Sequence, residues 1–273
     1  MHNPSPKLRP SSPAKRLFDR YEPFVYRPVR GAYHWWQNRR FRRRYQHVVG
    51  LIVGQVGWEV QTGPFQGMRY VQRALSSALL PKLLGTYKNE LHPALEKLLE
   101  TRYEAVVHIG SAEGYYAVGL ARRLPGATVY GYDTDPDARA MCGELSVRNG
   151  VADRVVIRGQ FTPDRLADLP GERFLVVRDV DGYETELFKP ELAHHWAGAD
   201  LIVELHDCLG LPCRDRVTAC LAPSHDLEVI PSGAKIFPPG VGIQLPEDDR
   251  RLAVDELRPA QSWLIARPRA TGL

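Results

Sequence analysis

One stretch near the middle of the chain constrains the fold more than any other, because it has the pattern of a strand, a glycine turn and a helix. Residues 105–109 are a short apolar run rich in β-branched side chains, whereas residues 116–124 place apolar side chains at helical spacing. The turn between them, residues 110–114, reads GSAEG. Glycines let a backbone approach a ligand closely, and a helix start offers free N–H donors. The stretch therefore predicts a site of nucleotide size.

Strands and helices are expected to alternate through the rest of the chain. The expected strands are 105–109, 127–132, 154–158, 173–178 and 200–205, with two more at 227–230 and 263–266. The expected helices between them are 114–124, 136–149, 163–168, 184–196 and 211–221. This alternation predicts an α/β fold with a parallel sheet and helices on both faces. A long Pro- and Gly-rich connection separates the last two strands, and we expect it to form a lid over the substrate side.

Composition places the chain in the ordinary globular class. Its 273 residues are 44% apolar and 25% charged, which is enough to bury a sizeable core. The chain contains no run of eighteen apolar residues, so we expect no membrane span. Its beginning is rich in Pro, Arg and Ser and has no apolar signal core, so we expect a cytoplasmic protein.

The basic charge is concentrated at the beginning of the chain. Residues 1–48 carry 12 lysines and arginines against 2 acidic residues, a balance of +10, while the remaining 225 residues hold 24 against 30. Aromatic residues are interleaved with these arginines, a mixture that could bind RNA or an anionic membrane surface. The favoured alternative is that the aromatics pack this arm onto the domain or onto a second copy of the chain. We therefore expect a basic aromatic arm (1–48), a lead-in with a β-hairpin and helices (49–100), and a main domain (101–273).

The lead-in is expected to contain a hairpin at 58–71 and helices at 79–84 and 90–100. Tyr87, just before the second helix, and Glu90, at its start, are candidates for the roof of the site.

The glycine turn favours one kind of cofactor over another. A dinucleotide site needs G-x-G-x-x-G, but Ala112 stands where the second glycine would let the backbone approach a pyrophosphate. S-adenosylmethionine has no phosphate and needs only the turn and a partner for its ribose. Asp133, at the end of the next strand, lies 23 residues after Gly110, where a carboxylate can accept bonds from ribose hydroxyls.

At this point the chain resembles the class I S-adenosylmethionine-dependent methyltransferases, and within them the FkbM-type methyltransferases. The resemblance runs from about residue 83 to residue 230. It rests on four segments: GSAEGYY (110–116), YDTDP (132–136), VRDVDGYE (177–184), which is similar to I-D-V-E-G-Y-E, and LIVELHD (201–207), which is similar to a strand ending in E-x-H. The sequence departs from the family at His108, where many members carry an acid, and at Arg178, where an apolar residue is common.

The resemblance implies a Rossmann-like fold with a mostly parallel seven-stranded sheet and an antiparallel C-terminal strand. It also implies a small-molecule acceptor with a hydroxyl group, on a sugar or in natural product biosynthesis. An O-methyltransferase is favoured too because no N/D-P-P-Y/F segment, which marks methylation of planar amines, follows the fourth strand.

Ligands in such sheets sit at the carboxyl ends of the strands. The turn should face the methionine part, with Glu113 near its charged groups, while Asp133 holds the ribose and the residues after the third strand lie near adenine. The expected cofactor-binding residues are Gly110, Ser111, Glu113, Gly114, Tyr115, Asp133, Gln160, Phe161 and Asp179.

Five ionisable residues follow the fourth and fifth strands, namely Asp179, Asp181, Glu204, His206 and Asp207. Methyl transfer to a hydroxyl requires the acceptor to be held in line and its proton to be removed. His206 is the preferred base because imidazole titrates near neutral pH, and Asp181 could serve instead.

A divalent cation such as Mg²⁺ is an alternative way to activate the acceptor. Its expected ligands are Asp179, Glu204 and Asp207, since Mg²⁺ prefers oxygen ligands. Carboxylates after a strand also often cap the next helix, so both interpretations stay open.

Two other functions remain open from the sequence. One is an RNA or protein methyltransferase guided by the basic arm, and the other is a non-catalytic module that binds the cofactor and uses the arm for assembly.

Overall fold

One sheet forms the centre of the structure. The computed structural model describes residues 39–75, 77–171, 173–180, 184–206 and 213–269, and within them seven strands pair in the order β3-β2-β1-β4-β5-β7-β6. The strands are β1 (Ala105–Ile109), β2 (Thr128–Tyr132), β3 (Val155–Arg158), β4 (Phe174–Arg178), β5 (Ala199–Leu205), β6 (His225–Pro231) and β7 (Ser262–Pro268). Strands β1 to β5 pair in parallel, and β7 is antiparallel to both β5 and β6. The predicted fold class, a mostly parallel seven-stranded sheet with an antiparallel C-terminal strand, is confirmed.

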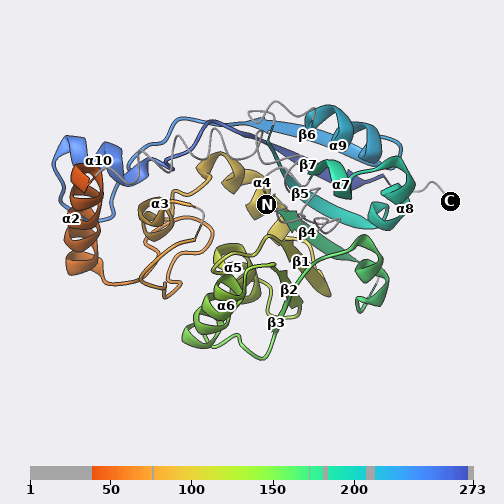
Figure 1. Cartoon of the computed structure of the whole chain (residues 1–273), viewed down its shortest axis with the longest axis horizontal. Helices are drawn as coiled ribbons and strands as arrows, with labels where there is room; N and C mark the ends of the chain where they lie inside the picture. Colours follow the sequence, from red (N-terminus) through yellow and green to blue (C-terminus); the bar gives the residue numbers. More distant parts are fainter. Residues whose placement is uncertain (1–38, 76, 172, 181–183, 207–212, 270–273) are drawn as a thin grey trace, which may run out of the picture.

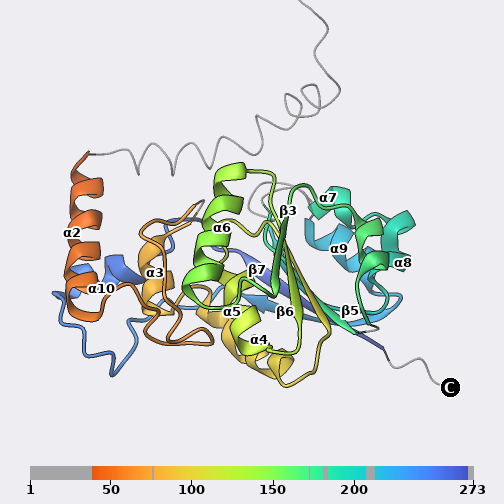
Figure 2. The ribbon, with the colours of Figure 1, turned by 90° about the horizontal axis from the view of Figure 1, so that it is seen from below.

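Helices cover both faces of this sheet, as Figures 1 and 2 show. On one face lie α4 (His92–Leu99), α5 (Tyr115–Arg123) and α6 (Pro136–Arg148), and on the other α7 (Glu184–Leu187), α8 (Ala193–Trp196) and α9 (Cys213–Leu221). Successive side chains of a strand point to opposite faces, so Val106 packs in the core with α5 while Val107 packs in the core around Trp196. Burial on both faces explains why the central strands are continuous apolar runs.

The pairing register of β1, β4 and β5 places the residues that end these strands side by side. Arg178 pairs with Ile109 on one side and with Val203 on the other. The residues that follow these three are Gly110, Asp179 and Glu204, so they meet at the carboxyl edge of the sheet. Glu204 in turn pairs with Trp263 of β7.

The N-terminal segment builds a helical end beside the sheet. Helix α2 (Arg39–Val56) packs with α3 (Leu79–Leu84) and α10 (Glu247–Val254) at the end of the molecule where Figure 1 draws red next to blue. Tyr45 is buried, and its hydroxyl accepts a hydrogen bond from the Leu80 N–H at 3.0 Å. Residues of the arm that the structure describes therefore pack onto the domain, and α2 continues through the expected boundary at residue 48.

A hairpin is present within 58–71, but its expected extent was wrong. Its two short arms form one antiparallel bridge, between Glu59 and Arg69, and the Tyr70 N–H donates to the Trp58 carbonyl at 2.8 Å. The chain between them bends so that the buried Phe65 packs on α5, where Gly119 leaves room for the ring. A Cβ at Gly119 would lie 2.5 Å from that ring.

The prediction of one continuous helix at 184–196 is also wrong. It divides into α7, a short 3-10 helix η3 (Pro190–Leu192) and α8. Pro190 has no N–H to donate and restricts the residue before it, and Lys189 is accordingly extended, with φ −95° and ψ 148°. Two further 3-10 helices are η1 (Asn89–Leu91) and η2 (Pro163–Asp168). None of the helices in the described ranges has the length and apolar character needed to span a membrane.

The packing of α2 can be tested by truncating its buried face. Ile52 is fully buried, so Ile52→Ala should lower the free energy of unfolding by about 2–5 kcal/mol, measured by denaturant titration. His47→Ala, on the exposed face of the same helix, should change it by less than about 0.5 kcal/mol. Equal effects of the two substitutions would contradict the packing of this helix.

Candidate functional site

A cavity of about 490 Å³ opens at the carboxyl ends of β1, β2 and β4. It lies where the strand order reverses direction, since β1 pairs with β2 on one side and β4 on the other, and this is where open α/β sheets bind ligands. Its walls come from the glycine turn, the ends of three strands and two distant segments. The lining residues are Leu75, Ser77, Lys82, Tyr87, His108, Gly110, Ser111, Ala112, Tyr115, Tyr116, Asp133, Thr134, Asp179, Val180 and Arg258.

The turn after β1 uses the left-handed backbone region three times. Gly110, Ala112 and Gly114 have φ angles of 80°, 45° and 99°. A Cβ at Gly110 would lie 2.2 Å from the carbonyl oxygen of Asp179, so glycine is required there. Ala112 adopts its unusual conformation while its N–H donates to the Asp133 carboxylate at 2.8 Å. Asp133, the residue after β2, therefore stabilises the conformation of this turn.

Asp133 lines the cavity and also holds its wall. One carboxylate oxygen accepts the Ala112 N–H, and the other accepts the Asp135 N–H at 2.9 Å. A carboxylate offers about four acceptor sites, so each oxygen can take a further bond from a ligand hydroxyl. Its predicted role toward a ribose is compatible with this geometry.

Three buried polar side chains around the cavity have no hydrogen-bond partner among the described residues. They are His108, with both ring nitrogens, Ser111, with its hydroxyl, and Tyr115, with its phenol group. Each is at most 4% exposed, and each lines the cavity. Buried polar groups are nearly always bonded, because an unsatisfied one costs about 1–3 kcal/mol. These groups are consistent with a polar ligand that completes their hydrogen bonds.

His108 contributes a neutral ring to the cavity. Burial lowers the pKa of its imidazole to about 4, and its ring makes an edge contact with Tyr116 at 5.7 Å between centroids. A neutral imidazole has one donor and one acceptor nitrogen. His108 can therefore pair with either a donor or an acceptor group of a ligand, unlike an ionised carboxylate, which only accepts.

The prediction that Glu113 contacts the cofactor needs correction. Its carboxylate is fully buried and does not line the cavity. It forms an ion pair with Lys82 and accepts hydrogen bonds from the Tyr70 hydroxyl at 2.6 Å and the Leu75 N–H at 3.0 Å. Burial would raise its pKa, but Lys82 and these donors outweigh that effect and lower it. Glu113 thus anchors the N-terminal segment over the turn.

Three other predicted cofactor residues also lie away from this cavity. Gly114 is the residue before α5 and lies against Cys142, since a Cβ at Gly114 would lie 2.8 Å from the Cys142 sulfur. Gln160 is exposed, while Phe161 is buried between Tyr132 and Trp196 in the second core. Of the predicted set, the cavity brings together Gly110, Ser111, Tyr115, Asp133 and Asp179.

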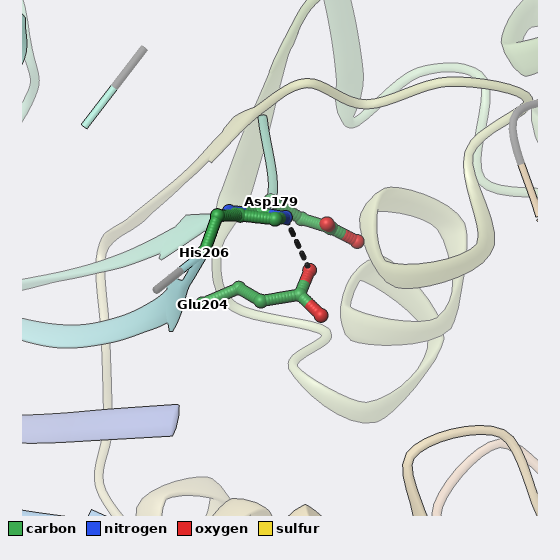
Figure 3. Close-up of side chains that lie close together, drawn as sticks. All are labelled: Asp179, Glu204 and His206. Carbon is green, nitrogen blue, oxygen red and sulfur yellow. Dashed lines mark ion pairs between the residues drawn. The ribbon is translucent and has the colours of Figure 1, made fainter. Parts of the chain in front are cut away.

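The expected chemical centre at the ends of β4 and β5 is a compact cluster. Figure 3 shows Asp179, Glu204 and His206, which each present a ligand atom within 4.8 Å of the others. Nε2 of His206 lies 3.7 Å from a Glu204 oxygen. Asp179 is 19% exposed and lines the cavity, whereas Glu204 and His206 are fully buried. Asp181 and Asp207 lie outside the described residues.

Two cations, neither of them predicted from the sequence, lie in this cluster. The Lys88 ammonium lies 2.7 Å from Asp179 and 2.8 Å from Glu204, and Arg258 lies 2.8 Å from the second Glu204 oxygen. Burial and the Asp179 charge raise the pKa of Glu204 to about 7. Burial would also raise the pKa of Asp179, but Lys88, Glu204 and Arg258 together hold it well below its usual range.

Lys82, the partner of Glu113, was also not predicted from the sequence. Neither Lys82 nor Lys88 belongs to a recognisable motif.

Of the two residues expected to roof the site, Tyr87 does line the cavity. Glu90 lies instead in a neighbouring cavity of about 190 Å³, where it pairs with Lys235 at 2.5 Å.

Comparisons with models of protein families and with curated proteins found no match. Solved structures do resemble the chain. The O-methyltransferase TomG from Streptomyces achromogenes, involved in tomaymycin synthesis and solved with SAM, is 16% identical, with 83% of this chain and 90% of that one covered and a TM-score of 0.46. An O-methyltransferase from Bacillus cereus in complex with SAH is 13% identical, with 83% and 91% covered and a TM-score of 0.47. The precorrin 8w decarboxylase of Methanobacterium thermoautotrophicum is 19% identical, with 66% and 90% covered and a TM-score of 0.43.

The buried imidazole of His108 predicts a pH-dependent stability. Its pKa is about 4 in the folded chain against about 6.5 when exposed, so the unfolded state binds more protons between these values. The free energy of unfolding should therefore be greatest above pH 6.5 and fall by about 3 kcal/mol more in the wild type than in His108→Gln as the pH is lowered to 4. Denaturant titrations at pH 7, 5.5 and 4 check this. Parallel pH profiles of the two proteins would contradict it.

Proposed function

We propose that the chain is an S-adenosylmethionine-dependent methyltransferase of the FkbM type that methylates a hydroxyl group on a small molecule, sugar or other natural product. The observation that carries the proposal is the cavity at the switch point, with Asp133 on its wall and three unsatisfied buried polar groups around it. Asp133 would hold the ribose hydroxyls, and His108, Ser111 and Tyr115 would bind the methionine part.

The turn itself argues against a phosphate-bearing cofactor. The N–H of Ala112, at the centre of the turn, is already bonded to Asp133 and cannot be offered to a pyrophosphate. Dinucleotide sites depend on a close backbone approach at this position. A donor without phosphates therefore fits the turn better than NAD does.

When bound, S-adenosylmethionine would supply a methyl group on a sulfonium for direct displacement. The chain must then place the acceptor hydroxyl in line and accept its proton. Asp179 is the member of the described cluster that lines the cavity, and we propose that it orients the acceptor. Because its pKa is held low, Asp179 is not the final proton acceptor. We propose His206, which has a ring nitrogen within 4.8 Å of an Asp179 oxygen, as the base that receives the proton by way of that carboxylate, with Asp181 as the other candidate.

Replacing Asp133 tests the donor site. Asp133→Ala should weaken S-adenosylmethionine binding by about 10- to 100-fold, since hydrogen bonds to a charged group contribute about 1.5–3 kcal/mol. Isothermal titration calorimetry measures this, with thermal unfolding to show that the turn survives the loss of the Ala112 bond. The variant Asp133→Asn keeps the size of the side chain and removes its charge, so its affinity shows how much of the loss is due to the charge.

The matched control is Asp137→Ala, which removes an exposed carboxylate four residues later and should leave the affinity unchanged. If the wild-type chain does not bind S-adenosylmethionine, the proposed function is wrong.

Replacing His206 tests the base. His206→Gln should lower kcat by about 10²- to 10⁴-fold while leaving the affinity for S-adenosylmethionine unchanged, because the residue does not line the cavity. His194→Gln, an exposed histidine on α8, serves as the control. Single-turnover rates with an accepted hydroxyl substrate measure the effect, and an undiminished rate removes His206 as the base.

A further inference from the structure

The cluster at the ends of β4 and β5 has the spacing of a metal site. Asp179, Glu204 and His206 place oxygen and nitrogen ligands within 4.8 Å of one another, as Figure 3 shows. Two carboxylates and an imidazole are a ligand set that binds divalent cations. The sequence also suggested a metal here, through Asp179, Glu204 and Asp207, of which Asp207 lies outside the described residues.

The place between the two carboxylates is already taken. The Lys88 ammonium lies within 2.8 Å of an oxygen on each of them, which is the geometry of two charge-assisted hydrogen bonds. Arg258 supplies a second positive charge to Glu204 at 2.8 Å. Lys88 and Arg258 thus supply one cation for each of the two carboxyl groups. A divalent ion would have to displace Lys88 and would leave its ammonium buried without a partner, which is costly.

The fold holds Lys88 in this place by several independent contacts. The residue is fully buried and adopts a left-handed backbone with φ 54°, a conformation that costs free energy in a non-glycine residue. Its N–H donates to the Glu256 carboxylate at 2.8 Å. Its ammonium lies 4.1 Å from the ring centroid of Trp263, a close cation–π contact. Such constraints fix the ammonium between β4 and β5 before any ligand arrives.

From these contacts we infer that the Lys88 ammonium is the resident cation of this site, in the place that a divalent metal would take, and that the chain acts without a bound metal. Only the second half of this inference rests on the proposed methyl transfer. Lys88 is a positioning residue, because it does not line the cavity and acts through Asp179, which does. The ammonium carries one positive charge, whereas a divalent metal ion would carry two and would act as a Lewis acid. Without that ion, an acceptor hydroxyl near Asp179 depends on a side-chain base for its deprotonation.

Manganese binding tests the inference without any methyl donor. Electron paramagnetic resonance titrations of the purified full chain with Mn²⁺ should show no stoichiometric site in the wild type. Lys88→Ala vacates the place between the carboxylates, so it should bind one Mn²⁺ per chain at least roughly tenfold more tightly than the wild type binds any. The double variant Lys88→Ala with Glu204→Gln should lose this gain.

Lys82→Ala is the matched control, because Lys82 is also buried and paired with one carboxylate but lies outside the cluster. It should gain no Mn²⁺ site. Circular dichroism reports folding, and Lys88→Gln, which keeps a long neutral side chain, replaces the alanine variant if that one unfolds.

One bound Mn²⁺ per wild-type chain would overturn the inference, and so would a folded Lys88 variant that binds no Mn²⁺. In an activity assay, EDTA should leave the wild-type rate unchanged, and a rate that EDTA abolishes and Mg²⁺ restores would also overturn it. If the wild-type chain binds no S-adenosylmethionine, the proposed function fails, but the Mn²⁺ titration still decides which cation the site holds.

Discussion

The parallel register of β1, β4 and β5 is the constraint on which the site depends. Because Ile109, Arg178 and Val203 stand side by side, the residues after them emerge at one edge and on one face of the sheet. Gly110 must be a glycine since the Asp179 backbone lies against it, and Asp179 then stands next to Glu204. A shift of one residue in the β4–β5 pairing would move the Asp179 or the Glu204 side chain to the opposite face of the sheet. The register therefore sets the chemistry of the cavity as well as the packing of the sheet.

Buried ion pairs attach the N-terminal segment to this edge. Lys82 pairs with Glu113 of the turn, and Lys88 pairs with Asp179 and Glu204 at the ends of β4 and β5. Such pairs add little net stability, because the desolvation of both charges offsets their attraction. They do impose geometry, since an unpaired charge in either place is far less favourable than the pair. The segment from Tyr70 to Lys88 is thereby held over the cavity as its second wall.

The sequence predicted the sheet, the glycine turn and Asp133, because each depends on local periodicity and on short spacings. It could not predict the partner of Glu113, since Lys82 lies 31 residues earlier in a segment without a motif. Lys88 and Arg258 were missed for the same reason, as both reach Glu204 only through tertiary contacts. The break at Pro190 was readable from the sequence, because proline excludes a continuous helix there. Features set by neighbouring residues in the sequence were thus predictable, whereas ion pairs between residues far apart in the sequence were not.

The insertion of β7 between β5 and β6 gives the site an order of assembly. Strand β7 is the last strand in the described chain, yet it pairs with β5 and supplies Trp263 beside Glu204. Arg258 comes from the segment just before it. During synthesis, β1 to β5 emerge before these residues. The Glu204 carboxylate therefore has neither Arg258 nor Trp263 beside it until nearly all of the described chain has been made, so the C-terminal strand completes the charged cluster.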